Sequence, residues 1–147
     1  VTQLDHDIAV EKGLYYYQGN DFASEIIFSI RRLAEPMKDH IDNNFSPLSE
    51  VQKDDFGKVS VRIISFLRNC ATMIRKNDYI GFEELIAESV TLMNQLTALK
   101  KGELKRIQGQ SGSTKVSMLY LTMVQEAQNV VSFTGNLLKV SRKFQKE

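Results

Sequence analysis

The sequence predicts an all-α fold, an antiparallel up-and-down helical bundle of about four helices. Apolar residues recur at steps of three and four through most of the chain, and no segment alternates with a period of two. Residues that stop helices gather at three short breaks, and helices joined by short breaks pack as antiparallel neighbours. With 147 residues, of which 42% are apolar and 25% charged, the chain is expected to form a single helical domain over residues 1–147.

The first helix is expected over residues 7–43. Its apolar stripe comprises Ile8, Tyr15, Phe22, Ile26, Ile30, Leu33, Met37 and Ile41. Gly13 and Gly19 each cost roughly 1 kcal/mol inside a helix and leave open a start near Asp21. The seven-residue spacing of the stripe across both glycines favours a continuous helix. Pro36 is expected to kink it, because proline removes one backbone hydrogen bond and clashes with the preceding turn.

The second helix is expected over residues 48–76, and its start has two alternatives. Pro47 fits the first helical position, whereas Ser49 and Gln52 have the spacing of a capping box. Its stripe comprises Phe56, Val59, Ile63, Phe66, Leu67, Cys70, Met73 and Ile74. Asn77 and Asp78 form the next break, and Asp78 is the expected N-cap of the third helix, because its carboxylate accepts hydrogen bonds from backbone N–H groups.

The third and fourth helices are expected over residues 79–108 and 115–145. The third stripe comprises Phe82, Leu85, Ile86, Leu92, Met93, Leu96 and Leu99. The fourth comprises Val116, Leu119, Tyr120, Met123, Ala127, Val130, Thr134, Leu137 and Leu138, with Gln125, Glu126, Gln128, Asn129 and Asn136 off the stripe. Between the two helices, the stretch from Gly109 to Thr114 has the composition of a linker.

Composition and charge exclude several classes of protein. A net charge of +1 argues against a general nucleic-acid or anionic-membrane binder. These residues contain no apolar run long enough to span a bilayer and no signal peptide. The single cysteine, Cys70, falls on an apolar face, where a buried and inert thiol is expected. Such cysteine usage indicates an intracellular chain.

The most polar cluster is the segment from Asp39 to Asn44. On a helix Asp39 and Asn43 lie one turn apart, as do His40 and Asn44, so that oxygen and nitrogen ligands could converge on a metal ion. The alternative is a helix C-terminus whose last carbonyl groups are satisfied by His and Asn side chains. The helix end is favoured, because no second histidine or cysteine completes a ligand set.

Two charged groups have similar alternatives. Glu84 and Glu88, with Glu83 alongside, have the spacing of carboxylate ligands, but the Glu-x-x-His motifs of di-metal bundles are absent. A solvated face near a helix N-terminus is therefore favoured. The basic run from Lys100 to Arg106 fits a solvated helix end better than a phosphate or lipid site. We expect no catalytic, cofactor-binding or metal-binding residues, no cofactor and no enzymatic activity.

Two stretches together resemble a known family. The first runs from Gly13 through Gln18 to Ser29–Pro36 and Asp39–Asn44, and the second contains Ser117–Leu121, Gln125, Glu126 and Asn136–Lys139. They are similar to the cytoplasmic C-terminal, PhoU-like region of Pit-family inorganic phosphate transporters, in the long form found in Bacteroides-like bacteria. The resemblance covers residues 4–144. Proper PhoU proteins bind metal through repeated acidic residues four apart on two helices, and Glu84 and Glu88 form one pair with this spacing here.

The resemblance implies a PhoU-like helical bundle that is part of a longer membrane transporter chain. Its implied function is that of a non-catalytic regulatory or interaction domain at the cytoplasmic face of the inner membrane, with the membrane domain of the same transporter as partner. The alternative is a free-standing helical-bundle adaptor or scaffold that binds a partner helix. No nucleic acid is expected as a partner. A homo-oligomer is expected, formed through the first helix near Ile8, Tyr15 and Phe22.

Overall fold

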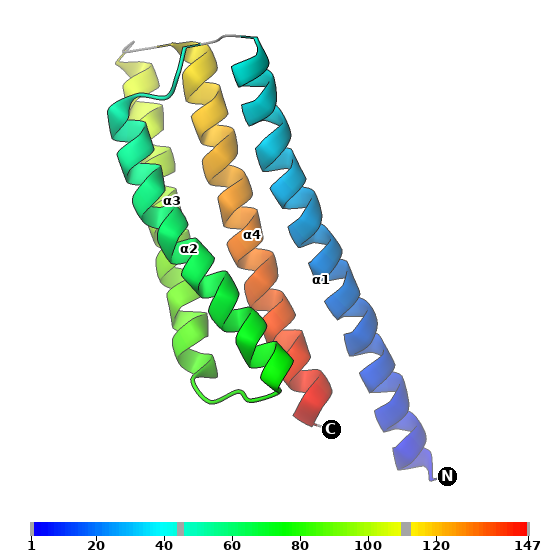
Figure 1. Cartoon of the computed structure of the whole chain (residues 1–147). Helices are drawn as coiled ribbons and strands as arrows, with labels where there is room; N and C mark the ends of the chain where they lie inside the picture. Colours follow the sequence, from blue (N-terminus) through cyan, green and yellow to red (C-terminus); the bar gives the residue numbers. More distant parts are fainter. Residues whose placement is uncertain (1, 44–45, 110–112, 147) are drawn as a thin grey trace.

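The structure, a computed structural model, describes residues 2–43, 46–109 and 113–146. Their helices are α1 (Gln3–Asp42), α2 (Glu50–Lys76), α3 (Phe82–Gln108) and α4 (Thr114–Lys146), and these segments contain no strand. Successive helices run in opposite directions, so both chain ends and the α2–α3 turn lie at the same end of the bundle (Figure 1). The predicted all-α, up-and-down bundle of four helices is confirmed.

Helix α1 begins earlier than predicted because Thr2 caps it. The Thr2 hydroxyl accepts a hydrogen bond from the backbone N–H of Asp5 at 3.2 Å, and the Asp5 carboxylate accepts one from the backbone N–H of Thr2 at 3.1 Å. This reciprocal pair is a capping box, with aspartate in place of the usual glutamate. The helix then continues through Gly13 and Gly19 without interruption, as the continuous alternative predicted, and Pro36 lies inside it. The kink expected at Pro36 stays a prediction.

Of the two capping predictions, the one for the start of α2 is correct and the one for the start of α3 is wrong. At α2 the Ser49–Gln52 alternative is correct, since the Ser49 hydroxyl accepts from the Gln52 N–H at 3.1 Å and the Gln52 side chain accepts from the Ser49 N–H at 2.9 Å. At α3 the prediction of Asp78 as N-cap is wrong. The N-cap is Gly81, whose φ of 86° suits glycine, and no side chain caps it. Asp78 instead accepts from the N–H of Ile80 at 3.1 Å, within the turn.

Helix α4 is the centre of the molecule. It contacts α1 on one side and both α2 and α3 on the other, whereas no Cα atom of α1 comes within 8 Å of α2 or α3 among the described residues. The apolar core therefore comes from three helices. Its buried residues are Val59, Ile63, Phe66, Cys70 and Met73 of α2, Phe82, Leu92 and Leu96 of α3, and Tyr120, Val124, Ala127, Val131 and Leu138 of α4. Helix α1 lies outside this core, and α4 is the described helix whose backbone it approaches.

Candidate functional site

The segment around His40 forms a helix end, as the favoured alternative predicted. His40 is buried, and its Nε2 lies 2.6 Å from the carbonyl oxygen of Ser46, beyond the end of α1. The Asn43 side chain donates to the carbonyl of Asp39 at 2.7 Å, which satisfies one of the last acceptors of the helix. Asn44 lies outside the described residues. Among residues 2–43, 46–109 and 113–146, no three His, Cys, Asp or Glu side chains are placed to hold a metal ion.

The acidic residues at the start of α3 separate into different interactions instead of converging. Glu88 forms an ion pair with Arg62 of α2, with oxygens 2.8 and 3.0 Å from the guanidinium. Glu83 pairs with Arg142 of α4 at 3.3 Å. Glu84 is exposed and lines a pocket. The interpretation as a simple solvated face was therefore incomplete, because Glu83 and Glu88 each join α3 to a neighbouring helix.

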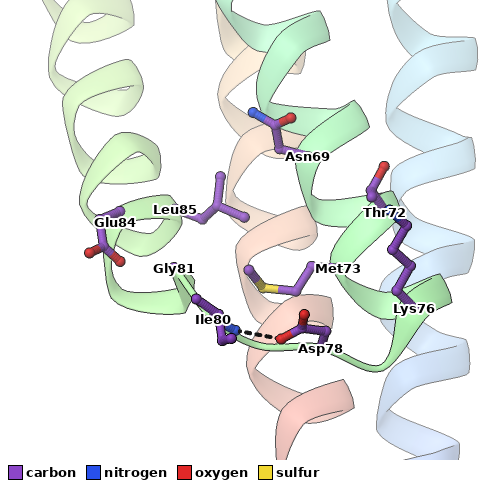
Figure 2. Close-up of a pocket in the computed structure, with 9 residues that line it drawn as sticks. All are labelled: Asn69, Thr72, Met73, Lys76, Asp78, Ile80, Gly81, Glu84 and Leu85. Atoms are coloured by element: carbon purple, nitrogen blue, oxygen red, sulfur yellow. Dashed lines mark hydrogen bonds between the residues drawn. The ribbon is translucent and has the colours of Figure 1, made fainter.

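The pocket beside Glu84 lies at the turn between α2 and α3 (Figure 2). It is open to solvent, with a volume of about 420 Å³. Its lining mixes charge and apolar surface: Asn69, Thr72, Met73, Lys76, Asp78, Ile80, Gly81, Glu84 and Leu85. In Figure 2 the Lys76, Asp78 and Glu84 side chains come from the end of one helix, the turn and the start of the next, and they do not meet at a common point. This arrangement offers no paired acid and base.

The basic run of α3 contains a buried acid that the sequence reading did not single out. Glu103 is 1% exposed. Its carboxylate accepts a hydrogen bond from the Gln52 side chain at 2.9 Å and forms an ion pair with Arg106 at 3.2 Å. The spacing carried a signal, since Glu103 follows Leu96 and Leu99 at the seven- and four-residue steps of the apolar stripe. The prediction that this run is only a solvated helix end was wrong for Glu103.

A second polar network crosses the middle of the bundle and joins three helices. We call it the polar layer; its members are Ser29 and Arg32 of α1, Thr97 and Lys100 of α3, and Gln125, Glu126, Gln128 and Asn129 of α4. On the α3 side, Gln128 donates to Thr97 at 3.0 Å and accepts from Lys100 at 3.0 Å. On the α1 side, the Arg32 guanidinium is 3.2 Å from the Glu126 carboxylate.

The polar layer links its two sides through α4 itself. The Lys100 ammonium also donates to Gln125 at 2.6 Å, Gln125 donates to Asn129 at 3.1 Å, and Asn129 donates to Glu126 at 3.1 Å. Arg32 completes the chain of contacts with a hydrogen bond to the buried Ser29 hydroxyl at 3.0 Å. A continuous path of hydrogen bonds therefore runs from α3 through α4 to α1.

The burial of this layer departs from the sequence reading. Glu126 and Gln128 lie off the apolar stripe of α4 but are only 8% and 7% exposed. They are buried because α4 is covered on two sides, whereas a single stripe predicts one covered face. Polar groups in such a position need hydrogen-bond partners, since an unsatisfied one costs about 1–3 kcal/mol. The layer supplies these partners, and it fixes which side chains of α1 lie opposite α4.

The attachment of α1 differs from that of the other helices. Only Ser29 and His40 of its forty residues are buried. Ile8, Tyr15 and Phe22, for which an unpartnered subunit face was predicted, are half-buried, and the Lys143 ammonium of α4 lies 5.9 Å from the Tyr15 ring. These three residues are therefore not the most exposed apolar residues of α1. The exposed apolar residues of α1 are Leu4, Val10, Leu14, Tyr16, Tyr17, Ile27, Phe28, Ile30 and Ile41.

Cys70 is buried in the three-helix core, as predicted. It is 1% exposed, and burial raises the pKa of its thiol to about 12. A thiol with this pKa stays protonated at neutral pH and is a poor nucleophile. Its role here is that of a small apolar side chain.

None of the described helices is both long enough and apolar enough to cross a bilayer. Comparisons of the chain with protein-family models, with curated proteins and with solved structures found no match. The functional argument therefore depends on the residues, the fold and the stated resemblance.

Proposed function

We propose that this chain is a non-catalytic regulatory domain of a Pit-type inorganic phosphate transporter, placed at the cytoplasmic face of the inner membrane. In this proposal α1 is a movable lever and the membrane domain of the same transporter is its partner. The observation that carries the proposal is the unequal attachment of α1, which has no share in the buried apolar core and whose backbone approaches that of α4 but not that of α2 or α3 among the described residues. The assignment to a phosphate transporter is supported by the sequence resemblance alone.

The attachment of α1 has the energetics that a movable element requires. Its contact with α4 includes the Arg32–Glu126 ion pair, in which the arginine side chain is 48% exposed. Exchange of such contacts for contacts with water costs little, because a typical hydrogen bond has a net value of only about 0.5–1.5 kcal/mol. Elements with few buried apolar contacts open at free energies well below that of global unfolding. Helix α1 is therefore expected to separate from α4 while α2, α3 and α4 stay folded.

A regulatory role follows from this two-state behaviour. A partner that binds the separated α1 better than the docked one shifts the population towards separation, by as much as its affinities for the two states differ. The polar layer sets the starting equilibrium, because it must be broken on the α1 side when α1 leaves. A change at Glu126 or Arg32 should then alter regulation without removing any catalytic group.

The proposal is tested in the natural full-length protein, produced in a bacterial strain that lacks its own phosphate uptake. We expect the protein in the membrane fraction, uptake of radiolabelled phosphate, and a change of at least twofold in the phosphate concentration for half-maximal uptake with Glu126→Gln. The matched control is Glu50→Gln, at a side chain that is 91% exposed, which should leave uptake unchanged. A protein found in the soluble fraction without uptake would contradict the proposal and favour the adaptor alternative.

A further inference from the structure

Helix α1 carries a second regular pattern, on the side turned away from α4. Two sets of residues repeat every seven positions, three residues out of phase: Val10, Tyr17, Ser24 and Arg31, and Gly13, Asn20, Ile27 and Ala34. We call these eight residues the outer seam. All except the half-buried Gly13 are exposed. Positions at this spacing lie in one line along a helix and can face a second helix, as in a coiled coil. The apolar residues among them are Val10, Tyr17, Ile27 and Ala34.

The outer seam of one copy can be matched with the outer seam of a second copy that runs in the opposite direction. If two copies run antiparallel about a point between Asn20 and Ser24, Tyr17 lies opposite Ile27 of the second copy and Val10 lies opposite Ala34. Arg31, the longest side chain, then lies opposite Gly13, which has no side chain. At the centre the small polar Asn20 and Ser24 face each other, where a hydrogen bond can fix the register. Two of these pairs, Arg31 with Gly13 and Val10 with Ala34, join a larger to a smaller side chain, and Tyr17 with Ile27 forms the apolar layer between them and the centre.

Gly13 and Arg31 supply independent support for this arrangement. A glycine in a helix interior costs roughly 1 kcal/mol relative to alanine, yet a Cβ at Gly13 would meet no atom within 4 Å. Nothing inside the described chain therefore requires glycine there, and the space beside Gly13 is open to the long Arg31 side chain of a second copy. Arg31 forms no ion pair or ring contact among the described residues, although its neighbour Arg32 is held by Glu126. A parallel pair would place the two Arg31 charges side by side, and this opposes a parallel arrangement.

The exposed area of this face is close to what a stable dimer needs. Tyr16, Tyr17 and Phe28 are 60%, 70% and 47% exposed, which corresponds to roughly 350 Å² per copy for aromatic side chains of about 150–250 Å² each. Val10, Leu14 and Ile27, each more than half exposed, add a comparable area. The total approaches the figure of about 800 Å² per partner that is typical of specific interfaces.

We propose that the outer seam of α1 binds the same seam of a second copy of this chain, as an antiparallel two-fold pair of helices centred between Asn20 and Ser24. A two-fold interface uses the same patch on both copies, and the reversed complementarity of the seam meets this condition. This inference does not depend on the transporter, since it concerns only residues 10–34. Its failure would leave the proposed regulatory function intact.

The oligomeric state of residues 1–147 tests the proposal. Sedimentation velocity at several concentrations should give twice the mass of the chain for the wild type. The double variant Tyr17→Glu, Ile27→Glu should give the mass of one chain, because a pair of such chains would hold four carboxylates in its apolar layers. The control is Val61→Glu on α2, at a side chain that is 69% exposed, which should stay dimeric. Circular dichroism checks that each variant remains helical.

Disulfide cross-linking tests the direction of the pair. Val10→Cys and Ala34→Cys chains, mixed and treated with a mild oxidant, should form a mixed covalent dimer, while each alone should not, because Val10 of the two copies would lie roughly 36 Å apart. The buried Cys70 does not compete. A wild type that is monomeric at every concentration, a dimer that survives the double glutamate variant, or cross-linking of either chain with itself would each overturn the proposal.

Discussion

Helix α4 packs against two different surfaces, and the difference between them separates the buried three-helix core from the more exposed packing of α1. Towards α2 and α3 it buries Tyr120, Val124 and Val131 completely, in a core built from all three helices. Towards α1 it presents Glu126 and also apolar side chains such as the buried Val140, which lies beside Gly19. Of the residues that α1 brings, only Ser29 and His40 are buried. Apolar burial contributes roughly 25 cal/mol per Å², whereas a partly exposed ion pair contributes little. The first surface therefore holds the fold, and the second holds one helix in place.

The difference between the two surfaces is tested most directly by truncating one leucine in each of them. Leu96→Ala, at a residue that is 0% exposed in the three-helix core, should lower the free energy of unfolding by about 2–5 kcal/mol, since it leaves a cavity. Leu33→Ala, at a half-buried residue of α1, should cost less than half as much. Urea denaturation measures both values. Equal losses would mean that α1 belongs to the core.

The buried Glu103 tests whether polar groups inside the three-helix part stabilise it. Glu103→Ala should cost about 2–3 kcal/mol, because it leaves the Gln52 amide without its acceptor and Arg106 without its counter-ion. Replacing both buried partners, as Gln52→Leu with Glu103→Met, should recover part of this loss, because the Gln52 amide no longer lacks its acceptor, while the Ser49 N–H loses the acceptor that the Gln52 side chain gave it. The measurement is again urea denaturation. If the double variant is as unstable as the single one, the Gln52–Glu103 pair stabilises the fold by more than satisfying each other's hydrogen-bonding groups.

Alkaline pH should weaken the three-helix core through its buried titratable groups. Burial raises the pKa of Cys70 and of Tyr120 to about 12, above the values of about 8.5 and 10 expected in the unfolded chain. The folded state therefore binds more protons at high pH, so that stability is complete below these unfolded values and falls as pH rises towards 12. Each group contributes a slope of up to about 1.4 kcal/mol per pH unit.

Thermal melts between pH 8 and pH 11 follow this loss of stability. The variant Cys70→Ala should show a shallower decline than the wild type, even though its stability at pH 8 is lower. Parallel pH profiles of the two proteins would count against the buried thiol as a source of the effect.

The smallest expected effect concerns the ion pair that joins α1 to α4. A double-mutant cycle on Arg32→Ala and Glu126→Ala should give a coupling energy of about 0.5–1 kcal/mol, because Arg32 is half exposed. Hydrogen exchange sharpens the comparison: both single variants should speed exchange of α1 amides while amides of α3 keep their protection. Equal acceleration in α1 and α3 would indicate one cooperative unit and would remove the basis for a movable helix.

Several elements could be read from the residues because their causes are local. The capping box of Ser49 and Gln52 depends on residues three positions apart, and the seven-residue spacing of Ile8, Tyr15 and Phe22 carried α1 across two glycines. The α3 start was misread although it is local too. Asp78 can accept a hydrogen bond either as a helix N-cap or within a turn, and Gly81, with its positive φ, allows the helix to begin three residues later. Aspartate is common both as an N-cap and in turns, so the residue type at position 78 does not distinguish the two.

The sequence by itself determined that this chain is helical, where its helices lie to within a few residues, and which stripe of each helix is apolar, because these properties arise from contacts within one or two turns. Only the tertiary structure decided that α4 is central, that Glu126, Gln128 and Glu103 are buried, and that apolar side chains of α1 such as Tyr17 and Ile27 are exposed. These properties depend on which helices neighbour each other, and a stripe records only that a face is covered, without stating by what or on how many sides. The candidate site therefore depends on contacts between helices, such as Arg32 with Glu126, residues 94 positions apart in the chain.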